Sequence, residues 1–186
     1  LSDVNVLFCP SDSEDSRDSF FTNDRPNPCK FRASSYNYMA WAINARDMLN
    51  SMDRENAENF DVGADLNGDF LIAMNDLVAD ITDPGVWDGS QSAADSVFDD
   101  DLSQGTVTAY RLREGIERFF ITDINNPASG ARAQSEIWVM YDDINSENPD
   151  FMNHIPGGCN VLYMDGHVEF VRYPGETPVS RAWATV

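Results

Sequence analysis

The stretch GGCNVLYMDGHVEF, residues 157–170, constrains the fold more than any other part of the chain, because it predicts a β-hairpin. Asp165-Gly166 suits a two-residue turn in which both central residues adopt positive φ. Such a turn pairs Met164 with His167, and side chains then alternate between two faces along each strand. We therefore expect one face of a C-terminal hairpin to be apolar and buried, and this face contains Val161, Tyr163, Val168 and Phe170.

The charge of the chain is strongly negative and unevenly distributed. The formal net charge is −20, which disfavours nucleic acids and anionic membrane surfaces as partners, because both require clustered Lys and Arg. Residues 47–101 contain 15 acidic residues and one basic residue, Arg54. We interpret residues from about 45 to 106 as an acidic insertion. Such acidity is typical of a solvated extracellular protein, a salt-adapted protein or a protein that binds cations.

Length and hydropathy favour one domain. A chain of 186 residues predicts a single domain, residues 1–186, with the acidic insertion inside it. No apolar run approaches the length of a membrane span. The first residue is Leu1 rather than Met, so we expect a processed or truncated chain.

Local patterns give a coarse set of elements. Residues 39–58 have apolar residues near helical spacing and are predicted to be a helix. Residues 82–106 are rich in Asp, Ser, Gly and Pro and are predicted to be a long loop. Residues 110–120 favour a short helix, although a strand that starts at Thr106 is an alternative. The stretch SEIWVMYDD, residues 135–143, predicts a strand.

The three cysteines leave two interpretations. Cys9 and Cys29 bracket a polar loop, and in an exported protein we expect a disulfide between them. Cys159 is then a free thiol beside the hairpin, which suits a small buried residue. The alternative is three reduced thiols.

Four stretches occur in a recognisable order, and together they resemble a known family. They are CPSD at residues 9–12, SSYNYMAW at 34–41, REGIERFFITDINNP at 113–127 and HIPGGCNVLYMDGHVEF at 154–170. This set resembles the prepilin-type H-x9-DG family, which is akin to type IV pilins and type II secretion pseudopilins. Ten residues separate His154 from Asp165, one more than the family name states.

The resemblance implies an α+β fold. The expected structure is a pilin-like globular head with an antiparallel sheet and a C-terminal β-hairpin. It also implies an amino-terminal hydrophobic helix, which residues 1–186 do not contain, and export by a prepilin-type route.

One stretch suggests a metal site. DLNGDFLIAMND, residues 65–76, resembles the calcium loop of dockerin modules. Calcium binds six to eight oxygen ligands, and an EF-hand-type loop supplies them from positions 1, 3, 5, 7 and 12. Phe70 occupies position 6, where a Gly normally permits the sharp turn. The alternative is an acidic loop before a helix that begins at Asn75 or Asp76. The predicted Ca²⁺ ligands are Asp65, Asn67, Asp69, the Leu71 carbonyl and Asp76.

Other candidate sites are weaker. His154 and His167, with Cys159 and Asp165, suggest a transition-metal site, but a surface histidine and a turn aspartate are the favoured interpretation. The sequence contains no nucleophile elbow, Gly-rich phosphate loop or HExxH motif. We therefore expect a protein that is not an enzyme.

These observations lead to one functional prediction and one alternative. The chain is expected to be the head of an extracellular or cell-surface filament subunit, stabilised by calcium. Its expected partners are copies of itself or related pilin-like subunits, without nucleic acid and without a membrane span in these residues. The alternative is a secreted calcium-dependent adhesion or carbohydrate-binding module, which exposed aromatic residues around the acidic insertion would favour.

Overall fold

A computed structural model of the chain describes residues 9–12, 17–27, 35–86, 88, 90–116, 134–146, 152–154 and 157–186. The fold is α+β, and its sheets are antiparallel. This confirms the predicted class and the antiparallel sheet. The helices are α1 (Arg17–Phe20), α2 (Ala45–Met48), η3 (Met52–Arg54), α3 (Val62–Asp65), α4 (Gly68–Thr82), α5 (Gln91–Phe98) and η6 (Trp183–Thr185). The strands are β1 (Phe21–Thr22), β2 (Arg25–Pro26), β3 (Tyr36–Tyr38), β4 (Trp41–Ala42), β5 (Leu102–Gln104), β6 (Val107–Arg111), β7 (Trp138–Asp142), β8 (Gly158–Tyr163) and β9 (Val168–Arg172).

The largest sheet has four strands in the order β3-β7-β8-β9. One face packs into the core, where Tyr141 of β7 and Val161 of β8 are buried. The C-terminal segment covers this face, since the Trp183 ring lies 5.0 Å from the Trp138 ring in an edge-to-face arrangement. The Trp183 indole N–H also donates a 2.8 Å hydrogen bond to the Tyr141 hydroxyl. The tail therefore forms part of the core.

The C-terminal hairpin is confirmed, but its predicted register is wrong by one residue. Leu162 pairs with Val168, and the Tyr163 N–H donates to the His167 carbonyl. The loop therefore has three residues, 164–166, and ends on Gly166 with φ of 89°. A shift of one residue moves a strand's side chains to the opposite face. Val161 and the half-buried Tyr163 face the core as predicted, whereas Val168 and Phe170 are 60% and 52% exposed.

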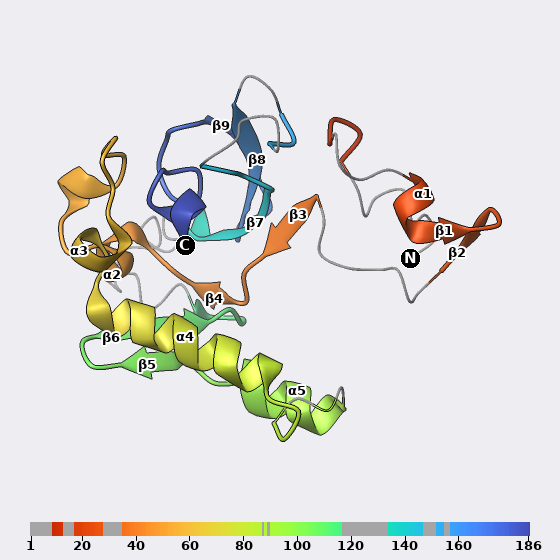
Figure 1. The fold of residues 1–186 in the computed structure, drawn as a ribbon, viewed down its shortest axis with the longest axis horizontal. Coiled ribbons are helices and arrows are strands. Elements are labelled where there is room, and N and C mark those ends of the chain that lie inside the picture. Colours follow the sequence, from red (N-terminus) through yellow and green to blue (C-terminus); the bar gives the residue numbers. More distant parts are fainter. Residues whose placement is uncertain are drawn as a thin grey trace.

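A second unit packs beside the large sheet. Strands β4, β6 and β5 form a three-stranded sheet, and α4 lies across it while α5 follows at the far end of α4 (Figure 1). Phe70 and Leu66 are buried against Val107 of β6 in the main core. The short α1–β1–β2 unit stands to one side of this body (Figure 1).

Three local predictions around the second unit are wrong. Residues 39–58 contain β4, α2 and η3 instead of one helix, and residues 82–106 contain α5 and β5 instead of a loop. The helix predicted over 110–120 is also wrong in the part that the structure describes, because residues 107–111 form a strand, as the alternative start at Thr106 suggests. Its buried positions are Val107 and Ala109, which is the two-residue period of a strand packed on one side. The predicted strand at 135–143 is confirmed as β7.

A helix must be long and apolar to cross a bilayer, and the described helices can be judged by this requirement. None of them has both the length and the apolar character needed to cross a membrane.

Candidate functional site

The predicted calcium ligands are not brought together. Helix α4 begins at Gly68, and the Asn67 side chain caps it by accepting a 2.9 Å hydrogen bond from the Asp69 N–H. Asp69 and Asp76 therefore lie on one helix, with about 10 Å of axial rise between them. Ligands of one Ca²⁺ ion each lie about 2.3–2.6 Å from it. The physical reason is Phe70, whose side chain is 1% exposed and packs in the core, so the chain continues as helix where an EF-hand loop turns.

The two carboxylates at the start of this stretch already have protein partners. Asp65 binds the Arg54 guanidinium through both oxygens, at 2.8 and 2.9 Å, and accepts from the Asp61 N–H. Asp69 Oδ2 accepts from the N–H and the hydroxyl of Thr106, at 2.8 and 2.9 Å. The hydrogen bonds from Arg54 lower the pKa of Asp65, and those from Thr106 lower the pKa of Asp69. Asp65 therefore links α3 to η3, and Asp69 links α4 to the residue before β6.

The two cysteines of the predicted disulfide are Cys9 and Cys29. Cys9 is a free thiol and is buried, and its predicted partner Cys29 lies outside the described residues. Cys159 is free and buried in the core, as expected. Burial raises the pKa of the Cys159 thiol to about 12, so this residue is an inert part of the packing.

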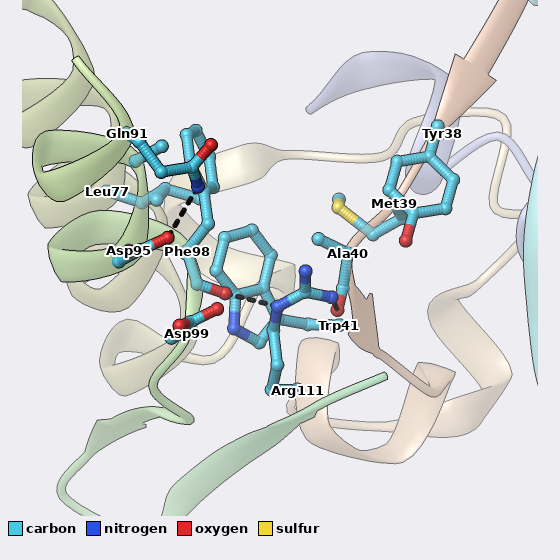
Figure 2. Close-up of a pocket in the computed structure, with 11 residues that line it drawn as sticks. Tyr38, Met39, Ala40, Trp41, Leu77, Gln91, Asp95, Phe98, Asp99 and Arg111 are labelled. Atoms are coloured by element: carbon cyan, nitrogen blue, oxygen red, sulfur yellow. Dashed lines mark hydrogen bonds between the residues drawn. The ribbon is translucent and has the colours of Figure 1, made fainter. Parts of the chain in front are cut away.

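A pocket lies between β4 and α5 (Figure 2), with a cavity volume of about 540 Å³. The Trp41 and Phe98 rings meet with centroids 5.9 Å apart, and the Arg111 guanidinium carbon lies 5.8 Å from the centre of the Trp41 ring. Arg111 donates to the carbonyls of Ala40 and Phe98, so its position is fixed by the backbone. Trp41 and Phe98 form the apolar floor of this pocket.

Polar groups surround this floor. Gln91 and Asp95 of α5 are joined by a 2.6 Å hydrogen bond, and Asp99 lies near them. Tyr38 and Met39 lie across the pocket from these side chains (Figure 2), and Tyr38 is 57% exposed. This pocket is not predictable from the sequence, because α5 falls within the stretch predicted to be a loop. An apolar floor with a few polar groups is typical of small-ligand sites.

A second cluster lies over the outer face of the large sheet. The His154 Nε2 atom is 3.7 Å from Cys9 Sγ and 2.9 Å from Asp142 Oδ2. Asp142 is 3% exposed, and the side chain of His154 is 24% exposed. In the described part of the chain this is the one group of three or more His, Cys, Asp or Glu side chains whose ligand atoms converge as a metal ion would require.

This cluster does not have the geometry of a nucleophilic triad. A histidine that activates a cysteine uses one ring nitrogen for the thiol and the other for the carboxylate that orients it. Here Cys9 and Asp142 both approach Nε2 of His154. The sequence suggests His154 and Cys159 as members of one metal site, but the thiol that lies beside His154 is that of Cys9, 145 residues away in the chain.

The cluster also joins two of the stretches that carry the family resemblance, and hydrogen bonds beside it bring in a third. Cys9 comes from CPSD and His154 from the closing stretch. Asp12 Oδ2, also in CPSD, accepts a 2.7 Å hydrogen bond from Ser35, which belongs to SSYNYMAW. The Asn153 amide donates to the Ser35 carbonyl. The stretch at 113–127 lies mostly outside the described residues.

Comparisons with protein families, curated proteins and solved structures found no match to this chain.

Proposed function

We propose that this chain is the head domain of an extracellular or cell-surface filament subunit of the pilin-like class, without catalytic activity. The observation that carries the proposal is the meeting of CPSD and SSYNYMAW with the chain just before the C-terminal hairpin, through Cys9, Ser35 and His154. These stretches resemble one family, occur in the order given above, and contact one another in the fold. Their contacts support a common structural origin more strongly than the similarity of short sequence motifs does.

The fold class gives further support. An α+β head with an antiparallel sheet and a C-terminal hairpin is what the resemblance implies, and the described residues have this coarser architecture. The net charge of −20 suits a solvated surface exposed to an aqueous exterior. In this proposal the head is displayed on a filament whose assembly uses apolar helical segments.

Immunoelectron microscopy of the native organism tests this proposal. Antibodies are raised against residues 1–186 and applied to whole cells and to the sheared surface fraction. We expect gold label along helical filaments on whole cells and in the sheared fraction. A control antibody against a cytosolic protein should not label these filaments. Antigen recovered only from the cell interior, or as isolated particles at the surface, would contradict the filament proposal.

The pocket beside α5 favours a second candidate, a carbohydrate-binding module. The half-buried Phe98 and the exposed Tyr38 line it together with Gln91 and Asp95, and aromatic rings beside polar groups suit a sugar ring and its hydroxyls. This pocket lies partly in the acidic insertion, where aromatic residues favour the alternative function. The ligand set predicted for calcium does not support calcium dependence.

A glycan array distinguishes this candidate from the first. Binding through the pocket should be lost in the exposed-residue variant Tyr38→Ala and kept in Phe170→Ala, which removes an exposed ring outside the pocket. Equal binding by both variants, or none by the unaltered chain, would remove the carbohydrate candidate.

A further inference from the structure

Three side chains of different chemistry meet over the outer face of the large sheet. Asp142 is the last residue of β7, while Cys9 and His154 lie in segments 133 and 12 residues away from it in the chain. Their ligand atoms, Sγ, Oδ2 and Nε2, all lie within 4.8 Å of one another. A fourth polar group completes the surroundings, because the Asn160 amide nitrogen is 2.8 Å from Asp142 Oδ2 and 3.0 Å from His154 Nε2.

Hydrogen bonds alone do not satisfy this arrangement. If His154 Nε2 carries a proton, it donates to Asp142, but the Asn160 N–H₂ group then faces another donor. If Nε2 is unprotonated, it accepts from Asn160, but its lone pair then faces a carboxylate oxygen at 2.9 Å. Exchanging the amide oxygen and nitrogen of Asn160 does not help, because the amide oxygen would then face Asp142 Oδ2 and two acceptors would meet. Each protonation state of His154 beside the Asp142 carboxylate leaves one repulsive contact.

We propose that Cys9, Asp142 and His154 bind a divalent transition-metal ion of the zinc class. Thiolate, imidazole and carboxylate are the ligands that Zn²⁺ takes in proteins. In a tetrahedral site, bond lengths of about 2.0–2.3 Å place nitrogen and oxygen about 3.3 Å apart, and nitrogen and sulfur about 3.6 Å apart. The corresponding separations here are 2.9 and 3.7 Å. A cation between these atoms removes the conflict at Nε2, because Asp142 and His154 then both face positive charge.

The surroundings of the three ligands suit such an ion. Asp142 Oδ2 accepts from both the backbone N–H and the amide of Asn160, at 2.7 and 2.8 Å, which fixes the carboxylate. The Phe170 ring meets the imidazole of His154 edge-to-face, with centroids 5.9 Å apart.

The ion has a structural role in this proposal. It ties the segment around Cys9 and the segment around His154 to the end of β7, closing chain segments of 133 and 12 residues. An ion bound by the folded chain but not by the unfolded chain stabilises the fold, and its ligands must lose protons to bind it. This role is independent of filament assembly.

Metal titration of the reduced full chain tests the site. We expect one Zn²⁺ per chain by competition with a chromophoric chelator, and a rise in melting temperature on binding. Co²⁺ in place of Zn²⁺ should give a thiolate-to-cobalt absorption band in the near ultraviolet. Cys9→Ser should abolish this band, and Asp142→Asn and His154→Gln should each weaken Zn²⁺ binding at least tenfold. Asn160→Ala should weaken it about tenfold, since it acts through Asp142.

The chain provides matched controls for these variants. Cys159→Ala and Cys29→Ser remove the other thiols, and His167→Gln removes the other imidazole, which is bonded to Asp165. All three should keep the cobalt band and the Zn²⁺ affinity. Circular dichroism of each metal-free variant separates loss of a ligand from loss of the fold.

Three results would overturn the proposal. The first is a cobalt complex of the unaltered chain without a thiolate band, which needs no variant to interpret. The second is a Cys9–Cys29 disulfide in non-reducing peptide maps of native material, because a disulfide leaves no thiolate at Cys9. Zn²⁺ affinity that is unchanged in both Cys9→Ser and His154→Gln, with the fold intact, would equally exclude these ligands.

Discussion

Arg54 binds both carboxylate oxygens of Asp65, with Nε 2.8 Å from Oδ1 and Nη2 2.9 Å from Oδ2. Arg54 also donates to the Asn59 carbonyl at 3.1 Å, and Asp65 caps the N–H of Asp61. This bidentate ion pair thus connects η3 to the end of α3. This pair includes the one basic residue of the acidic stretch 47–101.

Breaking this pair should lower the melting temperature more than breaking an exposed one. Arg54→Gln leaves Asp65, which is 8% exposed, without its cationic partner. The matched control is Arg113→Gln, because Arg113 forms a single 3.1 Å contact to Asp101 at a more exposed site. Thermal unfolding at neutral pH should show a clearly larger shift for Arg54→Gln. Equal shifts in melting temperature would mean that the bidentate geometry adds nothing to the stability of the chain.

The same pair predicts a pH dependence of stability. The hydrogen bonds from Arg54 lower the folded-state pKa of Asp65 below its ordinary value of 3.8. The stabilisation is therefore fully present above this value and declines as the pH falls toward the folded-state pKa. Denaturation curves between neutral pH and pH 2 should lose this contribution in the unaltered chain. Asp65→Asn should show a shallower decline, and an identical slope would contradict the assignment.

Calcium should not stabilise the chain specifically. Asp65 and Asp69 are bonded to Arg54 and Thr106, and Asp76 lies two turns along α4. Ca²⁺ and Mg²⁺ at equal concentration screen the net charge of −20 equally, so the two ions should shift the melting temperature of chelator-treated protein equally. A saturable extra shift with Ca²⁺ that disappears in Asp76→Asn would restore the dockerin-like interpretation.

The C-terminal hairpin is predictable because it follows from a local pattern, whereas the α+β class is what the family resemblance implies. Alternation along residues 158–163 and a Gly-containing turn are sufficient for a hairpin. The register depends on whether the loop has two or three residues, and Asp165-Gly166 is compatible with both lengths. The partners of Asp65 and Cys9 cannot be predicted in this way, because the fold brings in Arg54 from another element and His154 from 145 residues away. The pattern around Phe70 resembles a calcium loop, but burial of one aromatic ring favours the helix.

Phe170 tests the observed register of the hairpin, and the buried Phe70 of α4 provides the reference. Phe70 is 1% exposed and Phe170 is 52% exposed. Phe70→Ala should cost about 3–5 kcal/mol of unfolding free energy, because it leaves a cavity in the core. Phe170→Ala should cost less than about 1 kcal/mol, as expected for a surface position. Urea denaturation measures both values. A large loss for Phe170→Ala would indicate the two-residue turn instead.

Tyr141 should titrate late and destabilise the chain at high pH. Burial raises its pKa from 10.0 to about 12. The folded chain therefore holds this proton more tightly than the unfolded chain, so the stability from this group is present below pH 10 and falls between pH 10 and about 12. In an ultraviolet titration of phenolate, Tyr141→Phe should show one ionised tyrosine fewer than the unaltered chain. This difference should appear only above about pH 11. A change already complete near pH 10 would contradict burial of the hydroxyl.

Self-association of residues 1–186 should be weak at low salt. With 32 acidic against 12 basic side chains, copies of the chain repel one another across most contact geometries, and a Debye length of about 30 Å at 0.01 M salt leaves this repulsion unscreened. Filaments of the proposed class gain their driving force from burial of apolar helical surface, which is roughly proportional to area and independent of the charge on the heads. The described residues contain no long apolar helix that could provide this surface. Sedimentation of residues 1–186 in 10 mM salt should therefore give a monomer. Efficient polymerisation of these residues alone would mean that contacts between heads carry the assembly, and the proposed filament mechanism would then be wrong.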